Sequence, residues 1–226
     1  MPQPRTVAEH RVKTDRNLLE ADDSGAAIAE LGCPAMAVVH TIGHGTKSSE
    51  ELIEMLQSTD VRRLVDVRRF PGSSRHPQFS RAALERSLEA AKLDYEWRGE
   101  ELGGRRSGTE SSRHPAWRNR SFRAYADHMD TVGFRAALEA LEEIAVNELP
   151  AVMCAETLWW HCHRRLIADA LLLRGTRVVH LLSPGSAQEH VLNPAARASD
   201  DGWPVYDLGV TPDLIPRENA RAEPPS

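Results

Sequence analysis

The feature that most constrains this chain is the alternation of short apolar segments with longer segments of helical period. Five segments have the length and composition of buried strands: 37–42, 63–67, 93–97, 151–154 and 177–182. Apolar residues recur at helical spacing between them, in 48–56, 80–91, 122–129, 131–144 and 157–173. Strands that alternate with helices form right-handed βαβ units. We therefore predict an α/β fold, a single three-layer domain with a mainly parallel sheet.

Both ends of the chain lack this alternation. Residues 1–36 are polar and poorly periodic, which predicts an irregular N-terminal arm. Residues 184–226 are rich in Pro, Ala and Asp, which predicts an irregular C-terminal tail on the surface, with 204–208 as a segment that can dock on the domain. The α/β domain is therefore expected at 37–183, and a chain of 226 residues is long enough to bury one core.

Capping residues predict where several helices begin. Ser48 opens a capping box, and Thr131 and Thr157 stand at N-cap positions before later helices. Gly175 follows a basic residue at the end of the last of these helices, which is a typical C-terminal signal. A helix that begins at Thr157 places Cys162 in its first turns.

Composition limits the compartment and the partners. The chain is 41% hydrophobic and 27% charged, and it has no apolar run near 18 residues. Its N-terminus lacks the apolar core of a signal peptide. The three cysteines form no disulfide framework, which fits a reducing compartment. We therefore expect a cytoplasmic protein with no membrane partner.

The charge of the chain is unevenly distributed. The net charge of −5 argues against a general nucleic-acid binder. Residues 61–125, however, contain 15 Lys and Arg against 8 Asp and Glu, while the rest of the chain contains 13 against 25. Such a basic middle is typical of a face that attracts anions. The alternative is that these arginines lie on solvated helix surfaces.

Several chemically active side chains follow predicted strands directly. His44 follows the first strand, and Arg68 and Arg69 follow the second. Cys154 ends the fourth strand, and Glu156 stands two residues later. Parallel strands bring their carboxyl ends to one edge of the sheet, where ligands bind in open α/β folds. We therefore expect these side chains to share one cleft.

The loop after the second strand has the composition of a phosphate-binding turn. Arg68 and Arg69 offer guanidinium groups, and a turn with Ser73 and Arg75 offers free N–H groups. Neither a Walker loop nor a dinucleotide-binding fingerprint is present. We favour an anion site, and the alternative is that Arg68 braces Asp66.

Two cysteines and a carboxylate are the candidate catalytic groups of the stretch 150–165. Cationic neighbours lower the pKa of a thiol, which makes Cys162 the better thiolate candidate and Cys154 the second. A packing role is the alternative for both. Glu156 suits a general acid or base, with His44 to orient it, or else an acid that caps a helix.

Neighbouring residues are assigned to substrate binding. His163 and Arg164 would contact a phosphate, and Tyr125 and Trp159 would offer a surface for base stacking. The two cysteines of the stretch 150–165 are eight residues apart, unlike the Cys-x-x-Cys of a structural zinc site. We therefore predict no metal and no other cofactor, and the alternative is a transition metal bound by Cys154, His161, His163 and Glu156.

Several motifs in the same order resemble one family. CAE at 154–156 and HCHR at 161–164 follow TIGHG at 41–45 and LVDVRRFPGSSRHPQF at 64–79. Together they are similar to the Domain of Unknown Function 488 family, over most of the chain. The resemblance implies a shared fold and pocket and no particular reaction. Typical members have a serine where this chain has Gly45, so the hydroxyl group at that position is missing here.

These observations predict an enzyme that acts on an anionic small molecule or a nucleic acid and binds its phosphate through arginines. Hydrolysis of a glycosidic bond needs a carboxylate such as Glu156 and no metal, and it is the first reaction to test. One alternative is a non-enzymatic nucleotide or nucleic-acid binding module that uses the same pocket. The other is a cysteine-dependent enzyme with Cys154 or Cys162 as the nucleophile.

Overall fold

The structure is a computed structural model of the chain and describes residues 36–72 and 75–209. The predicted N-terminal arm up to residue 35, Ser73, and the predicted tail from residue 210 lie outside the described residues. The strands are β1 Val38–Gly43, β2 Arg63–Asp66, β3 Asp94–Trp97, β4 Pro150–Cys154, β5 Arg177–Ser183, β6 Ser186–Glu189, β7 Ala196–Ala198 and β8 Pro204–Tyr206. The α-helices are α1 Ser49–Gln57, α2 Arg81–Ala90, α3 Gly99–Leu102, α4 Arg120–Met129, α5 Val132–Asn147 and α6 Arg164–Leu173. Two short 3-10 helices are η1 Pro77–Phe79 and η2 Trp159–His161.

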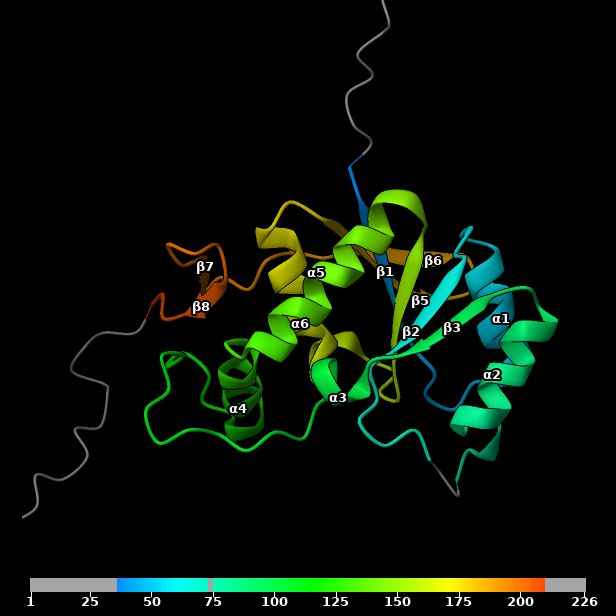
Figure 1. The fold of residues 1–226 in the computed structure, drawn as a ribbon, viewed down its shortest axis with the longest axis horizontal. Helices are drawn as coiled ribbons and strands as arrows, with labels where there is room; N and C mark the ends of the chain where they lie inside the picture. Colours follow the sequence, from blue (N-terminus) through cyan, green and yellow to red (C-terminus); the bar gives the residue numbers. More distant parts are fainter. Residues whose placement is uncertain (1–35, 73–74, 210–226) are drawn as a thin grey trace, which may run out of the picture. The chain divides into compact units, whose positions relative to one another are not determined.

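Six strands form the main sheet in the order β3-β2-β4-β1-β5-β6 (Figure 1). All neighbours are parallel except β6, which runs antiparallel to β5. In the register of the sheet, Gly43 pairs with Cys154, and Asp66 pairs with Met153. The carboxyl ends of β1, β2 and β4 therefore lie at the same edge. The predicted mainly parallel sheet is confirmed.

Helices cover both faces of this sheet. On one face, α1 and α2 pack against alternate strand residues, in a buried cluster that includes Leu52 and Met153. On the other face, α5 and α6 pack in a second buried cluster that includes Phe134, Ile167 and Val152. Val152 and Met153 are neighbours on β4 and join opposite clusters, because successive strand residues point to opposite faces. The three-layer α/β architecture is therefore confirmed. Among the described residues, every helix is too short or too polar to span a lipid bilayer.

Two of the predicted helix starts are confirmed. The Ser48 hydroxyl accepts a hydrogen bond from the backbone N–H of Glu51 at 3.1 Å, and the Glu51 carboxylate accepts one from the backbone of Ser48 at 2.7 Å. Thr131 Oγ1 likewise accepts from the backbone N–H of Phe134 at 3.3 Å. These bonds satisfy N–H groups that have no partner within the helix, and so they fix where α1 and α5 begin.

The predicted helix start at Thr157 is wrong, and so is the placement of Cys162 in the first turns of a helix. The chain forms only the 3-10 turn η2 there, and α6 begins at Arg164. Cys162 lies between the two elements with an extended backbone (φ −124°, ψ 154°). The buried Arg164 side chain donates from Nη2 to the backbone oxygen of Glu156 at 2.5 Å. This contact holds the preceding residues in a loop around the guanidinium group, which a continuous helix would not allow.

The sequence predicts a surface tail after Ser183, whereas the structure continues with three further strands. β6 extends the main sheet, and β7 and β8 form a separate two-stranded sheet. Trp203 and Tyr206 are buried in the core cluster of α5 and α6. Strands of three residues are too short to show a period in the sequence. Pro204 begins β8, a position where a strand tolerates proline.

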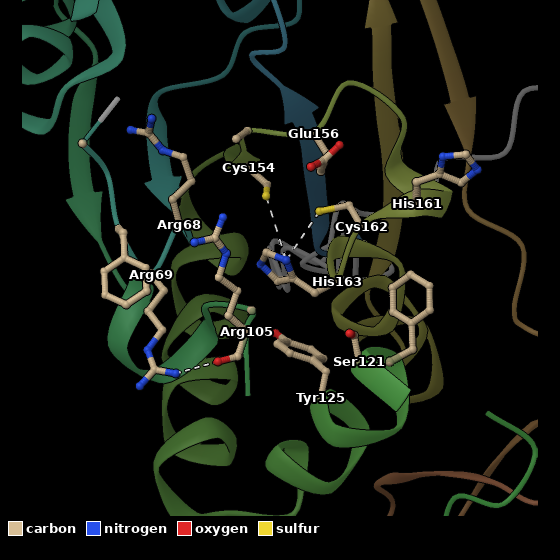
Figure 2. A pocket seen from close by; sticks show the side chains of 15 residues that line it. Arg68, Arg69, Arg105, Ser121, Tyr125, Cys154, Glu156, His161, Cys162 and His163 are labelled. Atoms are coloured by element: carbon tan, nitrogen blue, oxygen red, sulfur yellow. Dashed lines mark hydrogen bonds between the residues drawn. The ribbon is translucent and has the colours of Figure 1, made fainter. Parts of the chain in front are cut away.

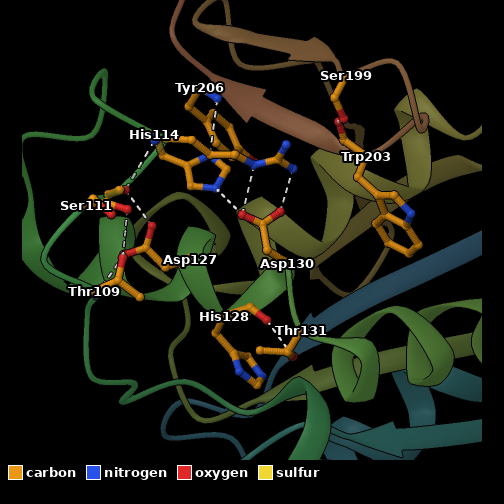
Figure 3. A network of polar contacts seen from close by, with 12 residues as sticks. Thr109, Ser111, His114, Asp127, His128, Asp130, Thr131, Ser199, Trp203 and Tyr206 are labelled. Carbon is orange, nitrogen blue, oxygen red and sulfur yellow. Dashed lines mark hydrogen bonds and ion pairs between the residues drawn. The ribbon is translucent and has the colours of Figure 1, made fainter.

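Polar contacts with α4 hold the long aperiodic stretch that precedes it. The hydroxyl groups of Thr109 and Ser112 donate to the carboxylate of Asp127, at 3.1 and 2.5 Å. His114 Nε2 lies 3.2 Å from the carboxylate of Asp130 (Figure 3). These contacts fix the course of the chain into α4, and the first turn of α4 contributes to the cavity described below.

A buried polar relay links the sheet to α6 and β8. His190 Nε2 donates to the Asp169 carboxylate at 2.9 Å, and Tyr206 OH donates to its other oxygen at 3.0 Å. His180 Nε2 lies 3.0 Å from His190 Nδ1. Thr41 Oγ1 lies 2.6 Å from His180 Nδ1 and completes the relay. All five side chains are buried, and the Asp169 carboxylate also accepts a hydrogen bond from the backbone N–H of Asn193 at 2.9 Å.

We expect Asp169→Asn to lower the free energy of unfolding by about 3–5 kcal/mol, because removal of one member of a buried charged network leaves its partners unpaired. Urea denaturation at neutral pH measures this change. The matched control is Asp201→Asn, since Asp201 pairs with Arg135 at the surface and is half-exposed. Its loss should cost far less, because a solvent-exposed ion pair contributes little to stability. Similar losses in both variants would show that the relay contributes little to stability.

Candidate functional site

A cavity of about 440 Å³ lies at the carboxyl edge of the sheet (Figure 2). Its walls come from the loop after β2, the residues after α3, the first turns of α4, and the segment between β4 and α6. The predicted site residues that line it are Arg68, Arg69, Tyr125, Cys154, Glu156, Cys162 and His163. We expected reactive side chains at the strand ends to share one cleft. The side chains that follow β2 and β4 do line the same cavity.

Cys154, Cys162 and His163 converge on one wall of the cavity, and we refer to them as the cysteine–histidine centre. His163 Nδ1 lies 3.5 Å from Cys162 Sγ and 3.9 Å from Cys154 Sγ (Figure 2). Both cysteines are buried, and His163 is half-buried. Cys154 is fixed by the register of β4, while the other two residues immediately precede α6. Three reactive side chains that lie up to nine residues apart in the sequence thus come within a few ångströms of one another.

The imidazole ring of His163 is held by close packing. The ring of Tyr125 lies 5.1 Å from it between centroids, and the Tyr125 hydroxyl donates to the backbone oxygen of Leu102 at 2.6 Å. Gly104 passes on another side, where a Cβ atom would come within 3.0 Å of His163 Nδ1. A side chain at position 104 would therefore push the ring away from the two sulfur atoms.

The two thiols of the centre have opposite pKa shifts. Burial would raise the pKa of Cys162, but a hydrogen bond from the Cys154 thiol, with His163 and Arg164 nearby, holds that pKa well below its ordinary value. The same hydrogen bond, together with burial, raises the pKa of Cys154 well above its ordinary value. Of the two cysteines, Cys162 is therefore the one that favours the thiolate form. The Cys154 thiol and the nearby nitrogen groups of His163 and Arg164 stabilise that form.

Arg164 lies directly behind the centre and is almost completely buried, with 1% of its surface exposed. Within the described residues it has no carboxylate partner, and its Nε has no hydrogen-bond partner. Its Nη2 donates to the backbone oxygens of Glu156 and Thr157, at 2.5 and 3.4 Å. The sequence assigned Arg164 to a phosphate, whereas the structure uses it to hold the loop after β4 and to supply positive charge to Cys162.

Arg68 forms an ion pair with Asp66, which is the alternative to an anion site that the sequence allowed. Its Nε and Nη2 donate to the two carboxylate oxygens of Asp66 at 2.8 and 2.6 Å, and both side chains are buried. Its Nη1 donates to the backbone oxygen of Phe79 at 2.8 Å and lies 3.3 Å from His44 Nε2. Most of its donors are thus occupied within the protein, although its edge reaches the cavity wall.

His44 sits behind the cavity wall and does not line it. Its ring stacks on Phe79 with centroids 4.2 Å apart, and its Nδ1 lies 3.0 Å from the backbone oxygen of Gly45. Burial, with Arg68 beside it, lowers the pKa of His44 to about 4. A neutral His44 therefore accepts from Arg68 and orients this arginine, which differs from the predicted role beside Glu156.

Gly45 has a backbone that favours glycine. Its φ of +52° lies in the left-handed region, and a Cβ atom would come within 2.2 Å of Thr157 Oγ1. The backbone N–H of Gly45 donates to the oxygen of Ala155 at 3.0 Å. The glycine thus allows the turn after β1 to lie directly against the loop after β4, where a serine side chain would not fit.

Two arginines at the cavity, Arg69 and Arg105, lack carboxylate partners within the described residues. Arg69 donates from Nη1 to the backbone oxygen of Arg105 at 2.7 Å, and neither side chain forms an ion pair there. Glu156 lies at the mouth and is solvent-exposed, and it is the one carboxylate on the described wall. Phe70 adds a large exposed aromatic ring, of which 64% is accessible. The mouth therefore combines positive charge with an aromatic surface.

Other predicted site residues do not reach the cavity wall. Trp159 stacks on the buried His180, with ring centroids 4.0 Å apart and the planes 8° apart, so one face of its ring is used within the protein. Arg75 is exposed outside the wall, and Ser73 lies outside the described residues. Of the residues predicted to form an anion site in this turn, only Arg69 and part of the Arg68 side chain line the described cavity wall.

Several wall residues are absent from the site predicted from the sequence: Phe70, Arg105, Ser121, Phe122, and His161, which the sequence suggests only as a possible metal ligand. Phe70 and His161 adjoin predicted site residues in the chain, and Arg105 belongs to an Arg- and Gly-rich stretch, so position and composition offered a signal for them. Ser121 and Phe122 reach the cavity only through the path of α4. No local sequence pattern indicates that path.

The fold and the cavity define a three-layer α/β protein with a cysteine–histidine centre and arginines at the carboxyl edge of its sheet. The family model for the domain of unknown function DUF488 matches residues 48–171, more than half of the chain. The protein belongs to this family, which confirms the resemblance drawn from its motifs. No curated protein and no solved structure matches the chain.

The different environments of Arg68 and Arg69 predict different effects on stability. Arg68→Gln should lower the free energy of unfolding by about 3–5 kcal/mol, because it leaves the buried Asp66 carboxylate without its cation. Arg69→Gln should change it by less than about 0.5 kcal/mol, since this side chain has no carboxylate partner within the described residues. Urea denaturation of both variants measures the difference. A stable Arg68→Gln protein would contradict the brace.

The depressed pKa of His44 predicts a loss of stability in mild acid. Between pH about 6.5 and about 4 the unfolded imidazole takes up a proton and the folded one does not, so stability is full above pH 6.5 and falls as the pH drops through this range. The slope reaches about 1.4 kcal/mol per pH unit for one such group. Denaturation series of the wild type and of His44→Gln measure it. The variant should lose stability less steeply, and equal slopes would contradict the assignment.

Proposed function

We propose that the protein is a cysteine-dependent enzyme that acts on an anionic, phosphate-bearing substrate, a nucleotide or a segment of nucleic acid. The observation that carries this proposal is the convergence of Cys154, Cys162 and His163 in the same cavity as arginines that have no carboxylate partner in the part of the chain that the structure describes. A nucleophilic or ligand-binding centre and groups that bind a phosphate are then within reach of one substrate molecule.

The charge and size of the cavity support an anionic substrate. Arg69 and Arg105 bring two positive charges to the mouth, against the single carboxylate of Glu156 on the described wall. A volume of about 440 Å³ falls within the range of about 300–1,000 Å³ that is typical of small-molecule sites. The exposed ring of Phe70 offers a surface on which a nucleobase can stack. Guanidinium groups and an aromatic ring together suit a nucleotide better than an isolated phosphate.

The position of Glu156 favours the cysteine-dependent reaction over hydrolysis of a glycosidic bond. A general acid of a glycosidase needs an apolar pocket that keeps its proton at neutral pH, and a second carboxylate about 5–9.5 Å away. Glu156 is instead solvent-exposed, and no second carboxylate lines the described wall. Glu156 then serves as a proton-transfer group at the mouth, beside the cysteine–histidine centre.

The proposed reaction needs both cysteines in the reduced form, which supports the predicted cytoplasmic location. Cys154 Sγ and Cys162 Sγ lie within 4.8 Å of each other, close to the separation of a disulfide. An oxidising compartment would join such a pair, whereas a reducing one keeps it reactive. We therefore retain the cytoplasm as the proposed location.

The arginines can be tested with inorganic phosphate, adenosine monophosphate and a short single-stranded oligonucleotide as probes. Arg69→Gln and Arg105→Gln should each weaken binding of the nucleotide probes by about 1.5–3 kcal/mol, the value of one charge-assisted hydrogen bond, and the loss should shrink at high salt. Isothermal titration calorimetry at two salt concentrations measures this. The matched control is Arg86→Gln on the exposed face of α2, which removes the same charge away from the cavity. An equal effect of all three variants would mean that only net charge matters.

The cysteine dependence separates an enzyme from a binding module. A panel of nucleotides and oligonucleotides is incubated with the protein, and products are identified by mass spectrometry. Cys162→Ser should bind the same probes with little change and lose conversion, because its side chain lies on the wall and the arginines stay in place. Thiol alkylation without effect on conversion would contradict cysteine dependence. Probes that bind tightly and remain intact would instead favour the binding module.

A further inference from the structure

We propose that the cysteine–histidine centre is a zinc site, in which Cys154 Sγ, Cys162 Sγ and His163 Nδ1 bind the ion and a fourth position faces the cavity. The inference deepens the proposed function, on which the catalytic meaning of the ion rests: the enzyme would depend on its cysteines because they hold the metal. Binding of the ion itself is independent of any substrate.

The three ligand atoms already have the spacing of a tetrahedral zinc site. His163 Nδ1 lies 3.5 Å from Cys162 Sγ and 3.9 Å from Cys154 Sγ, and all three atoms lie within 4.8 Å of one another. Zinc bonds of about 2.3 Å to sulfur and about 2.0–2.1 Å to nitrogen, at tetrahedral angles, place sulfur and nitrogen about 3.6 Å apart. The two nitrogen–sulfur distances therefore differ from those of a zinc site by only a few tenths of an ångström, and the two sulfur atoms lie within 4.8 Å of each other.

The chemistry of the donors selects the ion. Two thiolates and one imidazole are soft and intermediate ligands, which suit Zn²⁺, whereas Mg²⁺ and Ca²⁺ require oxygen ligands. Two thiolate charges neutralise a divalent cation. Each cysteine binds the ion as a thiolate, and the thiol protons that binding displaces pass to solvent. The ring of His163 coordinates through Nδ1 in its neutral form, with its remaining proton on Nε2.

The site is built on rigid elements. Cys154 ends the buried strand β4, and Cys162 and His163 precede the buried helix α6. The ring of Tyr125 and the close approach of Gly104 keep His163 Nδ1 directed toward the sulfur atoms. Ligands that are oriented before the ion arrives favour tight binding, because little conformational freedom is lost when the ion binds.

The position of the three ligands leaves the ion accessible from one side. All three residues line the cavity, so the fourth coordination position points into it. Catalytic zinc sites commonly have three protein ligands and one water molecule, whereas structural sites have four protein ligands. Glu156 is the carboxylate at the mouth of the same cavity and can exchange a proton with such a water molecule. This arrangement fits a hydrolytic reaction better than a structural role.

The same proximity also suits a disulfide between Cys154 and Cys162, and the experiment distinguishes the two. The full chain is purified, stripped with a chelator and kept reduced with a phosphine, and Zn²⁺ is then titrated against a competing chromophoric chelator. We expect one equivalent of Zn²⁺ per chain, and two fewer thiols that react rapidly with a thiol reagent. Co²⁺ should give the absorption of tetrahedral sulfur-ligated cobalt in the wild-type protein, a result that requires no variant.

Variants locate the ion. Cys154→Ser, Cys162→Ser and His163→Ala should each weaken zinc binding by more than about 100-fold, since loss of even an outer-shell partner costs about 10–100-fold. His161→Ala is the matched control, because His161 lines the same cavity outside the cluster and should bind zinc like the wild type. Circular dichroism of each stripped variant separates loss of a ligand from loss of the fold.

Three outcomes overturn the inference. The first is a reduced, folded wild type that binds no zinc at micromolar concentrations. The second is zinc binding that survives substitution of either cysteine. The third is a stable Cys154–Cys162 disulfide that forms in the presence of zinc and protects the thiols instead. In each case, conversion that still depends on Cys162 would leave the proposed function standing without the metal.

Discussion

The buried guanidinium of Arg164 is the constraint on which the site depends. It is almost fully removed from solvent, lacks a carboxylate partner in the described residues, and bonds instead to the backbone oxygens of Glu156 and Thr157. A buried charge is costly unless surrounding groups compensate it, and a nearby thiolate provides that compensation. The same contact bends the chain after β4 into a loop. The bend brings Cys162 and His163 back to the end of the strand, where Cys154 lies.

Arginines at this edge of the sheet divide into two groups with different roles. Arg68 and Arg164 are buried and have their hydrogen bonds inside the protein, to Asp66 and to backbone oxygens. Arg69 and Arg105 lie at the mouth without carboxylate partners in the described part of the chain. The buried pair shapes the centre and sets its charge, and the outer pair is available to a ligand. The two groups have similar neighbours in the sequence, so only their burial and their hydrogen-bond partners in the structure distinguish them.

The middle of α6 is anchored by the buried relay, and this connects the site to the C-terminal strands. Asp169 receives hydrogen bonds from His190 and Tyr206, which belong to the chain after β5. Trp159, in the turn that precedes the centre, stacks on His180 of the same relay. Two contacts therefore hold the loop between β4 and α6: the hydrogen bonds from Arg164 to its backbone, and the stacking of Trp159 on His180. This explains why the residues after Ser183 are part of the architecture that positions the site.

The sequence by itself determined the fold class, most strand positions, the starts of α1 and α5, and the family. These rest on local periodicity and capping, which act over a few residues. The same parallel topology correctly placed Arg68, Cys154 and Glu156 at one edge. Tertiary structure alone decided that Thr157 starts no helix, that Arg68 is a brace, and that the two cysteines meet one imidazole. Each of these depends on which side chain from a distant part of the sequence packs into a buried space. Residue spacing along the chain does not show which side chains come together.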